Sequence, residues 1–416
     1  MLNLLIENIN HDGEGIARNK GKVVFIPFTI VGEQVNVEIV EDKKYYSRGI
    51  LKEIVTKSSH RIEAKCPYYY NCGGCSYQHM AYEMQTSLKQ KIVQNTFKRI
   101  GGIDFEVKEL IGMQKPWNYR NKVTWHLVEE QKSIKMGFYR MRSNILIDIQ
   151  QCTLLKPVLN EVSHIIREMI HELKIGEKSS IMIRHSNDLN KVMIEFINCI
   201  PGKNLLKKLS GKAHSIYLQQ RGSSKLLFGE KGLTQRTGHS TFILGPHDFF
   251  QINPEQNEKL IHLVRQYLDL SGTEKVLDAY CGVGTFSINI ARDAFRVLGI
   301  DSNLQAINNA INNTLLNNIR NCQFIAGSCE HVLVNLKTRF NRIIVDPPRA
   351  GLKEAFIRSI LSVCPKIIVY ISCNPSTLAR DIKQFILNDY KLIDIQPLDM
   401  FPQTSNIENI VLLQKI

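Results

Sequence analysis

The sequence predicts a multidomain protein of three parts: a small OB-like β-barrel at residues 1–56, a central α+β domain at 57–245 and a C-terminal Rossmann-like α/β domain at 246–416. Three observations predict it. Short β-like runs alternate with turn signals in the first part, three cysteines gather in one glycine-rich loop of the second, and buried strands alternate with helical patterns in the third. A chain of 416 residues is long enough for several separate cores.

The charge balance restricts the class of partner. The chain has 53 Lys and Arg against 39 Asp and Glu, a net charge of +14, in an otherwise ordinary globular composition. Such a surplus favours a polyanion, nucleic acid first and an anionic membrane surface second. Because no apolar run can span a bilayer and the N-terminus lacks a signal pattern, we expect a cytoplasmic protein with no membrane partner. Its ten cysteines are then expected to bind metal, to catalyse or to lie buried, not to form disulfides.

The first part has the pattern of a nucleic-acid-binding barrel. Turn signals at 11–15 and 19–21 separate strand-like runs at 23–26 and 33–40. Cations and aromatic residues then alternate at Lys43, Lys44, Tyr45, Tyr46 and Arg48. This mixture suits an RNA platform, and equally a solvated hairpin tip with no partner. The tract resembles the TRAM domain of RNA-modifying enzymes through Gly13-Glu-Gly-Ile-Ala17, Phe25-Ile-Pro-Phe28 and Gly32-Glu33.

The central part carries a candidate metal centre. Cys66, Cys72 and Cys75 lie within ten residues, Cys152 follows much later, and the spacing is C-x5-C-x2-C-x76-C. Four thiolates can hold zinc or an iron–sulfur cluster. Zinc usually takes two close pairs, whereas three clustered cysteines and a remote one suit a [4Fe–4S] cluster better. We expect a structural role for the cluster, because nothing else in the sequence indicates electron transfer.

The rest of the central part predicts a core helix at 77–100, a helix at 158–173 and strands near 180–184 and 191–197. The stretch 116–122 combines aromatic residues, amides and cations, which suits unpaired RNA bases and phosphates. We expect RNA contacts from Arg120 and Lys122. For Trp117 and Trp125 an ordinary loop-and-strand role is equally expected.

The third part begins with the signature of a nucleotide-like cosubstrate. A buried strand ends at Asp278, a turn crosses Gly282-x-Gly284, and the next strand ends at Asp301. An acid at that place can accept the two hydroxyls of a ribose. The turn lacks the third glycine of dinucleotide sites and the lysine of phosphate-binding loops, so NAD and ATP fit poorly. The pattern resembles the S-adenosylmethionine (SAM) site of Rossmann-like methyltransferases.

Two further predicted strands end at residues that could bind the substrate base or react with it. Asp346-Pro-Pro-Arg349 follows one strand, and its prolines form a stiff turn that can shape a slot for a planar base. Arg349 stands where amino-methylating enzymes have an aromatic residue, which argues against N-methylation of adenine. Cys373 follows the strand 367–371 at the edge where open α/β sheets bind ligands, and a helix that Thr377 can cap follows it.

A cysteine and a carboxylate beside a methyl donor suit one chemistry. Uracil C5 is a poor nucleophile, but addition of a thiolate at C6 turns the ring into an enolate and activates C5. A base must then remove the C5 proton so that the cysteine can leave. Cys373 is the candidate nucleophile and Glu408, just before the terminal strand, the candidate base. Taken singly, each residue has the pattern of an ordinary buried thiol or surface carboxylate.

From the barrel to Ile416 the chain resembles the RNA uracil-C5 methyltransferase family, in particular its iron–sulfur-containing 23S ribosomal RNA branch with an N-terminal TRAM domain. The matching motifs are the four cysteines, Phe249-Phe-Gln-Ile-Asn253, Asp278-Ala-Tyr-Cys-Gly-Val-Gly284, Asp346-Pro-Pro-Arg349, Ser372-Cys-Asn-Pro375 and Phe401-Pro-Gln-Thr-x-x-x-Glu408. The resemblance implies a [4Fe–4S] cluster on Cys66, Cys72, Cys75 and Cys152, Cys373 as nucleophile and Glu408 as base. It also implies SAM contacts at Gln251, Tyr280, Asp301 and Asp346.

The expected activity is SAM-dependent methylation of uridine C5 in 23S rRNA by a monomer, on a single-stranded or looped uridine that must leave its stack. Alternatives are the T-loop uridine of tRNA, a catalytically silent RNA-binding or folding factor, and a cytosine-C5 methyltransferase. The last is expected to show a Pro-Cys motif, which Cys373 lacks. The chain departs from many relatives at Asn406, where they carry His, and at Asp301, where Glu is common.

Overall fold

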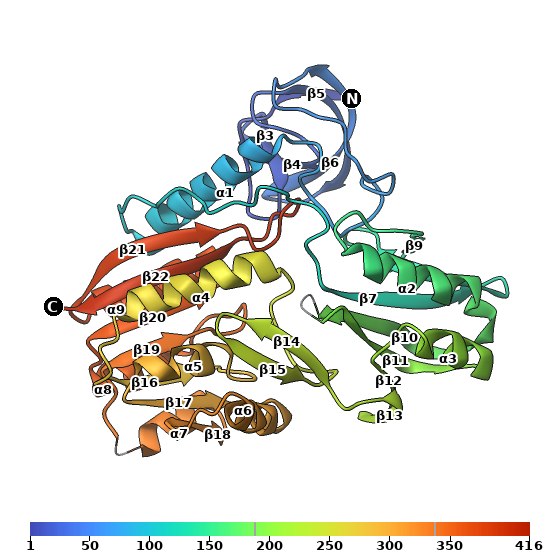
Figure 1. Cartoon of the computed structure of the whole chain (residues 1–416). Helices are drawn as coiled ribbons and strands as arrows, with labels where there is room; N and C mark the ends of the chain where they lie inside the picture. The colour runs from blue at the N-terminus through green and yellow to red at the C-terminus, as the bar shows by residue number, and fades with distance from the viewer. Residues whose placement is uncertain (187–188, 337) are drawn as a thin grey trace.

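The computed structural model describes residues 1–416 except 187, 188 and 337. Figure 1 shows a barrel in blue, a central sheet in green and a layered α/β body in yellow to red. No helix within the described residues is both long and apolar enough to cross a membrane. The three-part architecture is confirmed, while the boundaries at 56/57 and 245/246 stay predictions.

The barrel is one six-stranded sheet in the order β1-β5-β6-β4-β3-β2. Its strands are β1 Leu2–Leu5, β2 Asn8–Ile9, β3 Glu14–Asn19, β4 Lys22–Pro27, β5 Gln34–Asp42 and β6 Tyr46–Thr56. Alternate residues of β4 and β5 point inward, as the period of a strand requires. They close a small core of aliphatic side chains that includes Val24, Ile26 and Val35.

The central domain has a seven-stranded sheet in the order β13-β12-β11-β10-β7-β8-β9. The strands are β7 Lys122–Glu130, β8 Ser133–Tyr139, β9 Leu146–Asp148, β10 Leu173–Ser186, β11 Lys191–Pro201, β12 Ser215–Gln220 and β13 Ser223–Gly229. The helices are α2 Pro157–Glu168, the short η2 Ile170–Glu172 and α3 Lys203–Ser210. Trp125 is 0% exposed, stacks on Phe138 and donates its indole N–H to Ser163 Oγ at 2.7 Å. It is therefore a core residue of this sheet and not an RNA contact.

The C-terminal domain has a second seven-stranded sheet in the order β18-β17-β16-β19-β20-β22-β21. The strands are β16 Lys275–Ala279, β17 Arg296–Asp301, β18 Cys322–Ala326, β19 Arg342–Val345, β20 Ile367–Ser372, β21 Tyr390–Leu398 and β22 Glu408–Lys415. The helices are α4 Pro254–Leu268, α5 Thr285–Ile290, η3 Ala291–Asp293, α6 Leu304–Leu316, α7 Cys329–Asn335, α8 Glu354–Val363 and α9 Pro375–Ile386. The first five strands of that order pair in parallel, and β22 runs antiparallel between β20 and β21.

The order of the parallel strands reverses at β16, which has β17 on one side and β19 on the other. Ligands of open α/β sheets bind at such a switch point, outside the carboxyl ends of the strands. A hairpin of β14 Leu233–Thr237 and β15 Ser240–Leu244 packs on this domain and adds Phe242 and Leu244 to its core.

Helix α1, Tyr82–Thr96, lies against the C-terminal domain although it precedes the central sheet in the chain (Figure 1). With the π-helical turn η1, Phe97–Gly101, it shares one core with β21 and α9. Lys89 and Asp399 form an ion pair of 2.6 Å in which both side chains are 0% exposed. The helix thereby holds the segment 399–407, which leads into β22 and Glu408.

Candidate active site

Strand register brings Cys373 and Glu408 together. Ser372 at the end of β20 pairs with Asn409 of β22, so the next residues along the two antiparallel strands are Cys373 and Glu408. Their side chains lie on the same face, because side chains alternate along each strand. Cys373 is half-buried and Glu408 is buried.

The helix after Cys373 begins earlier than the sequence predicts. Asn374 is its N-cap, with its side chain accepting from the Ser376 N–H at 3.0 Å, and Pro375 occupies the first helical position. Thr377 is therefore inside the first turn, where its hydroxyl donates to the Arg349 carbonyl at 3.2 Å. The N-cap of α9 is consequently the residue that follows Cys373 in the chain.

A cavity of about 160 Å³ opens beside Cys373. Arg349 lines it and donates from Nη2 to Asn406 Oδ1 at 3.0 Å. The Asn374 side chain holds the Arg349 carbonyl at 3.0 Å. The remaining lining residues are His11, Asp12, Pro375, Ser405 and Ile407. Four separate segments of the chain (11–12, 349, 373–375 and 405–407) thus form one small pocket around a thiol and a cation.

The charges of the site are coupled. Burial raises the pKa of the Cys373 thiol and the nearby Glu408 carboxylate raises it further, while the Arg349 guanidinium lowers it. Burial and Asp346 hold the pKa of Glu408 well above its ordinary value, again with Arg349 opposing. Burial, with Asp278 adding to it, raises the pKa of Asp346 to about 7. Arg349 is therefore the cation that favours the ionised forms of both Cys373 and Glu408.

A second pocket lies at the switch point of the sheet, and Gln251, Tyr280 and Asp346 line it. Asp301 does not line it, but Asp301 Oδ2 accepts from the N–H of Gly282, which does, at 2.9 Å. Its other oxygen accepts from the Asn303 N–H at 2.8 Å. Because a carboxylate has about four acceptor sites, Asp301 keeps capacity for ribose hydroxyls.

The floor of this second pocket is rigid. Asp278 Oδ2 accepts from both the backbone N–H and the hydroxyl of Ser287, at 2.9 and 2.6 Å. Asp278 Oδ1 is buried and has no hydrogen-bond partner within the described residues. Tyr280 has a φ of 66°, a left-handed conformation that a bulky residue adopts only when its surroundings impose it. A buried acceptor without a partner and a shaped turn fit a polar cosubstrate such as SAM.

The four cysteines of the candidate metal centre converge. Cys66, Cys72, Cys75 and Cys152 are free thiols that line one cavity of about 200 Å³. Burial raises the pKa of all four, that of Cys72 to about 11 and that of Cys75 to about 12. Within the described part of the chain, no three His, Cys, Asp or Glu side chains are placed to hold a single metal ion.

The surroundings of the cysteine cavity fit an anionic inorganic group. Arg120 lines it, and its buried Nε has no hydrogen-bond partner among the described residues. A Cβ at Gly73 would lie 2.9 Å from Tyr139 O and Met141 N, so only glycine fits there. Arg120 therefore faces the thiols and not an RNA surface. Lys122, the other expected RNA contact, is largely buried at the start of β7, and burial lowers its pKa to about 8.

Sequence reasoning missed the barrel's part in the catalytic pocket. His11 and Asp12 lie in the turn before β3 yet line the cavity of Cys373. Gly13 lies so close to the same segment that a Cβ there would meet Ser405 Cβ at 3.3 Å. The sequence shows a turn at this place, but no local signal connects it with residues almost 400 positions later.

The fold, with its pocket at the switch point of the sheet and a thiol at a neighbouring strand end, is that of a SAM-dependent methyltransferase. Comparison with known proteins agrees: residues 236–416 match the family model described as tRNA (Uracil-5-)-methyltransferase, and residues 1–52 match the TRAM domain. An uncharacterised RNA methyltransferase of Halalkalibacterium halodurans is 35% identical over 445 residues, covering 100% of this chain and 97% of its own. One of Clostridium tetani is 34% identical, covering 99% and 95%.

Among solved structures, Pyrococcus abyssi tRNA (uracil-54, C5)-methyltransferase in complex with S-adenosyl-L-homocysteine matches with a TM-score of 0.79 and 29% identity, over 99% of this chain and 100% of that one. The chain belongs to the RNA uracil-C5 methyltransferase family and carries an N-terminal TRAM domain. Its activity is SAM-dependent methylation of uridine C5 in RNA. The enzyme class, the cosubstrate, the RNA uracil-C5 methyltransferase family and RNA as the class of substrate are confirmed, while the iron–sulfur-containing 23S rRNA branch stays a prediction.

Proposed function

We propose that Cys373 is the nucleophile and Glu408 the base of this methylation, and that the substrate is 23S rRNA. The observation that supports the assignment of roles is the register of β20 and β22, which makes Cys373 and Glu408 neighbours across the two strands, with Cys373 lining the cavity. Asp346 belongs to the adjoining pocket and interacts with both groups, so methyl donor and uracil would meet between them.

The first step forms a bond between Cys373 Sγ and uracil C6. The thiolate is the attacking form, and Arg349 together with the N-terminus of α9 favours it against burial. The electron pair of the C5–C6 double bond moves onto the C4 carbonyl, and the resulting enolate makes C5 nucleophilic. Arg349 is also the nearest cation of the cavity to oppose the new negative charge.

SAM supplies an electrophilic methyl group on a sulfonium and leaves as S-adenosylhomocysteine. We propose that Gln251, Tyr280, Asp301 and Asp346 bind it, with Asp301 accepting from the ribose hydroxyls and Tyr280 shaping the wall. The orphaned oxygen of Asp278 lies below the same turn. Tyr280, Asp301 and Asp346 lie at strand ends, where such folds bind their ligands, and Gln251 reaches the pocket from the loop before α4.

The last step restores the aromatic base. Glu408 takes the proton from C5, the C5–C6 double bond forms again and the Sγ–C6 bond breaks, which frees Cys373. A buried carboxylate with a raised pKa is a stronger base once it is ionised, and Arg349 favours that ionised form. The ion pair of Lys89 with Asp399 holds the segment 399–407 against α1, and this segment in turn positions Glu408.

The four cysteines are proposed to hold a [4Fe–4S] cluster. Four free thiols, a buried guanidinium and a glycine that admits no side chain support this assignment. The cluster would join the loop 66–75 to the loop after β9, so its role would be structural. Protein purified without oxygen should contain iron and acid-labile sulfide, and zinc as the sole metal would refute the cluster.

One observation favours tRNA as a second candidate substrate. The Pyrococcus abyssi structure, which matches this chain over 99% of its length, is that of a tRNA (uracil-54, C5)-methyltransferase. The three-domain architecture therefore does not by itself select rRNA. The proposal of 23S rRNA as the substrate rests on the resemblance of the four cysteines and the barrel to the ribosomal branch of the family.

The experiment that tests both points uses RNA with 5-fluorouridine in place of uridine, SAM and protein purified without oxygen. Fluorine at C5 cannot leave as a proton does, so the enzyme should remain bonded to the RNA through Cys373. In vitro transcripts of 23S rRNA and of tRNA are offered separately, and sequencing of the trapped RNA names the target. Trapping of tRNA alone would replace rRNA by the second candidate. No adduct with either RNA, although the RNA binds, would refute the proposed nucleophile.

A further inference from the structure

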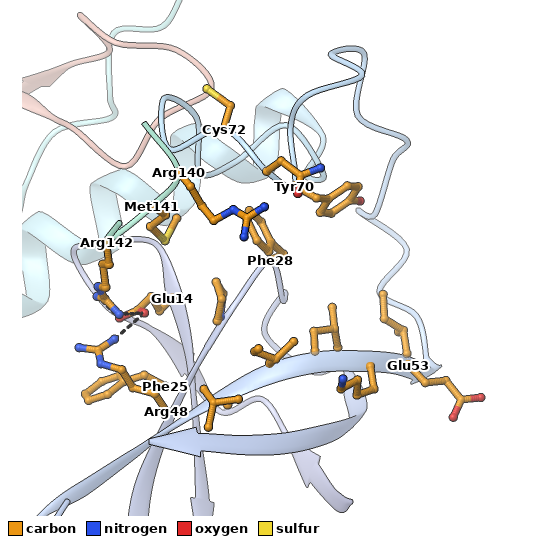
Figure 2. Close-up of a pocket in the computed structure, with 18 of the residues that line it drawn as sticks. Glu14, Phe25, Phe28, Arg48, Glu53, Tyr70, Cys72, Arg140, Met141 and Arg142 are labelled. Carbon is orange, nitrogen blue, oxygen red and sulfur yellow. Dashed lines mark hydrogen bonds and ion pairs between the residues drawn. The ribbon is translucent and has the colours of Figure 1, made fainter. Parts of the chain in front are cut away.

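A groove of about 790 Å³ runs between the barrel and the central domain. Figure 2 shows Phe25, Phe28 and Arg48 of the barrel on one side and Tyr70, Arg140 and Arg142 of the central domain on the other. Its volume is within the range of pockets that enclose a small organic molecule. The groove is separate from both pockets of the active site, and neither the family match nor the proposed mechanism assigns it a role.

The aromatic wall of the groove is held in a strained arrangement. Phe28 has a φ of 64°, a left-handed conformation that is strained for a bulky residue. Arg61 maintains it by donating to the Phe28 carbonyl at 2.8 Å while it pairs with the buried Glu33. The Phe28 ring meets the edge of Tyr70, with ring centroids 5.3 Å apart. Tyr70 is 56% exposed, so an aromatic face remains open to a ligand.

The cations of the groove fall into two groups. Arg48 and Arg142 converge on the buried Glu14, with distances of 2.7 and 2.6 Å, and fasten the barrel to the central domain (Figure 2). Arg140 and Lys57 have no ion-pair partner among the residues that the structure describes. Figure 2 shows the Arg140 guanidinium directed towards Phe28. Open aromatic faces beside free cations match an unstacked base with its phosphate.

The groove and the catalytic pocket lie on the two sides of a single turn. Glu14 lines the groove, whereas His11 and Asp12 line the cavity of Cys373. Asn10 closes the turn by accepting from the Asp12 and Glu14 N–H groups at 3.0 and 2.9 Å. One RNA strand can therefore place a nucleotide on each side of this turn.

We propose that this groove is a second nucleotide site for the substrate RNA, which binds an unstacked base of the strand beside the target uridine. The base stacks on the exposed ring of Tyr70, with Phe28 holding that ring in place, and Arg140 binds a phosphate. The inference rests on the proposed function, since it needs the same RNA to reach Cys373. The barrel then recognises the substrate RNA by binding a base that has left its stack, and not only by attracting the charged backbone.

Photocrosslinking on the trapped complex tests the placement. The 5-fluorouridine transcript that forms the adduct is prepared with 4-thiouridine at a fraction of the remaining uridine positions, trapped on the full-length protein and irradiated. Crosslinks to peptides that contain Phe28 or Tyr70 are expected. Crosslinks confined to the barrel surface at 43–46 or to the methyltransferase domain would overturn the proposal. Absence of the adduct itself would instead refute the proposed function.

Binding measurements provide a test that does not depend on the adduct. For a labelled oligouridine of about 12 nucleotides, Tyr70→Ala should raise Kd about tenfold, the effect of one lost base–aromatic stack, and Tyr70→Phe should retain the affinity. Arg140→Ala should reduce the slope of log Kd against log salt by about one, the loss of one phosphate contact. The matched controls are Phe295→Ala and Arg320→Ala, at an exposed aromatic residue and an exposed cation of the methyltransferase domain outside the groove. Equal effects of Tyr70→Ala and Phe295→Ala, or no effect of either, would overturn the proposal.

Discussion

The two cysteine regions of this protein differ in how their thiols are placed and in what surrounds them. Cys373 is a single thiol at a strand end, with Arg349 and a helix N-terminus as its positive neighbours. The other region brings four thiols into one cavity, where burial and then the neighbouring thiols raise the pKa of Cys72 and Cys75, while hydrogen bonds and the Arg120 guanidinium oppose this shift. A lone thiol with its own cation suits a bond that forms and breaks. Four thiols that repel one another need a common positive centre before they can all ionise.

The variant Cys373→Ala should have the largest effect and tests whether the single thiol alone carries the chemistry. We expect methylation to fall by roughly 10⁴-fold or more, because Cys373 is the one thiol among the described residues that line its cavity. Iron content and RNA affinity should stay unchanged, since the four-cysteine cavity is separate. The measurement is transfer of the methyl group from labelled SAM, with Cys364→Ala, at an exposed thiol outside both regions, as control. Turnover by the Cys373→Ala variant would remove the thiol from the mechanism.

Glu408→Gln separates bond formation from bond breaking at the single thiol. Turnover should fall by about 10²–10⁴-fold, the usual contribution of a general base, while the covalent RNA adduct accumulates on ordinary uridine RNA. Denaturing gels that retain protein–RNA adducts provide the measurement. Glu354→Gln, at an exposed carboxylate of α8, is the matched control. If the Glu408→Gln variant turns over at the normal rate, another group must remove the proton.

Arg349→Met tests whether a cation distinguishes Cys373 from the other thiols. Arg349 lowers the pKa of Cys373, so its removal raises that pKa and decreases the thiolate fraction at any pH below it. Adduct formation should slow by roughly tenfold or more at neutral pH, as for loss of a hydrogen bond to a charged group, and the deficit should shrink as pH rises. The pH profile of 5-fluorouridine trapping is measured for this variant and for Arg358→Met, at an exposed ion pair. A uniform deficit at every pH would exclude the electrostatic role.

Cys152→Ser changes the four-cysteine cavity alone and should have the smallest effect on methylation. The variant should lose most of its iron and sulfide and become less stable, because metal binding is coupled to folding. Per folded molecule, trapping of 5-fluorouridine RNA should stay within a few-fold of the wild type. Iron analysis, thermal unfolding and trapping are compared with Cys199→Ser, a buried thiol of the central sheet outside the cavity. If trapping were lost while stability was retained, the four-cysteine cavity would have a part in the reaction at Cys373.

Much of the active site follows from the sequence because of the regularity of parallel sheets. Asp301, Asp346 and Cys373 each follow a predicted strand, and the carboxyl ends of parallel strands lie at one edge. The turn after Asp278 is equally local, since its glycines and the capping contact to Ser287 lie within ten residues. Periodicity and strand order therefore predict that these strand ends lie at one edge of the sheet, while the roles of their residues in SAM binding and catalysis come from the family resemblance and stay predictions.

Tertiary structure alone decided which distant segments complete the sites. Lys89 follows a helical pattern and would be expected at the surface, yet it is buried against Asp399, 310 residues away. Trp125 and Arg120 share a stretch that suits RNA, but one fills the core of a sheet and the other faces the cysteine cavity. His11 and Asp12 are part of an ordinary turn until the barrel docks over Cys373. Local patterns report the period of an element and its end, whereas the partner across a domain interface depends on how whole surfaces pack.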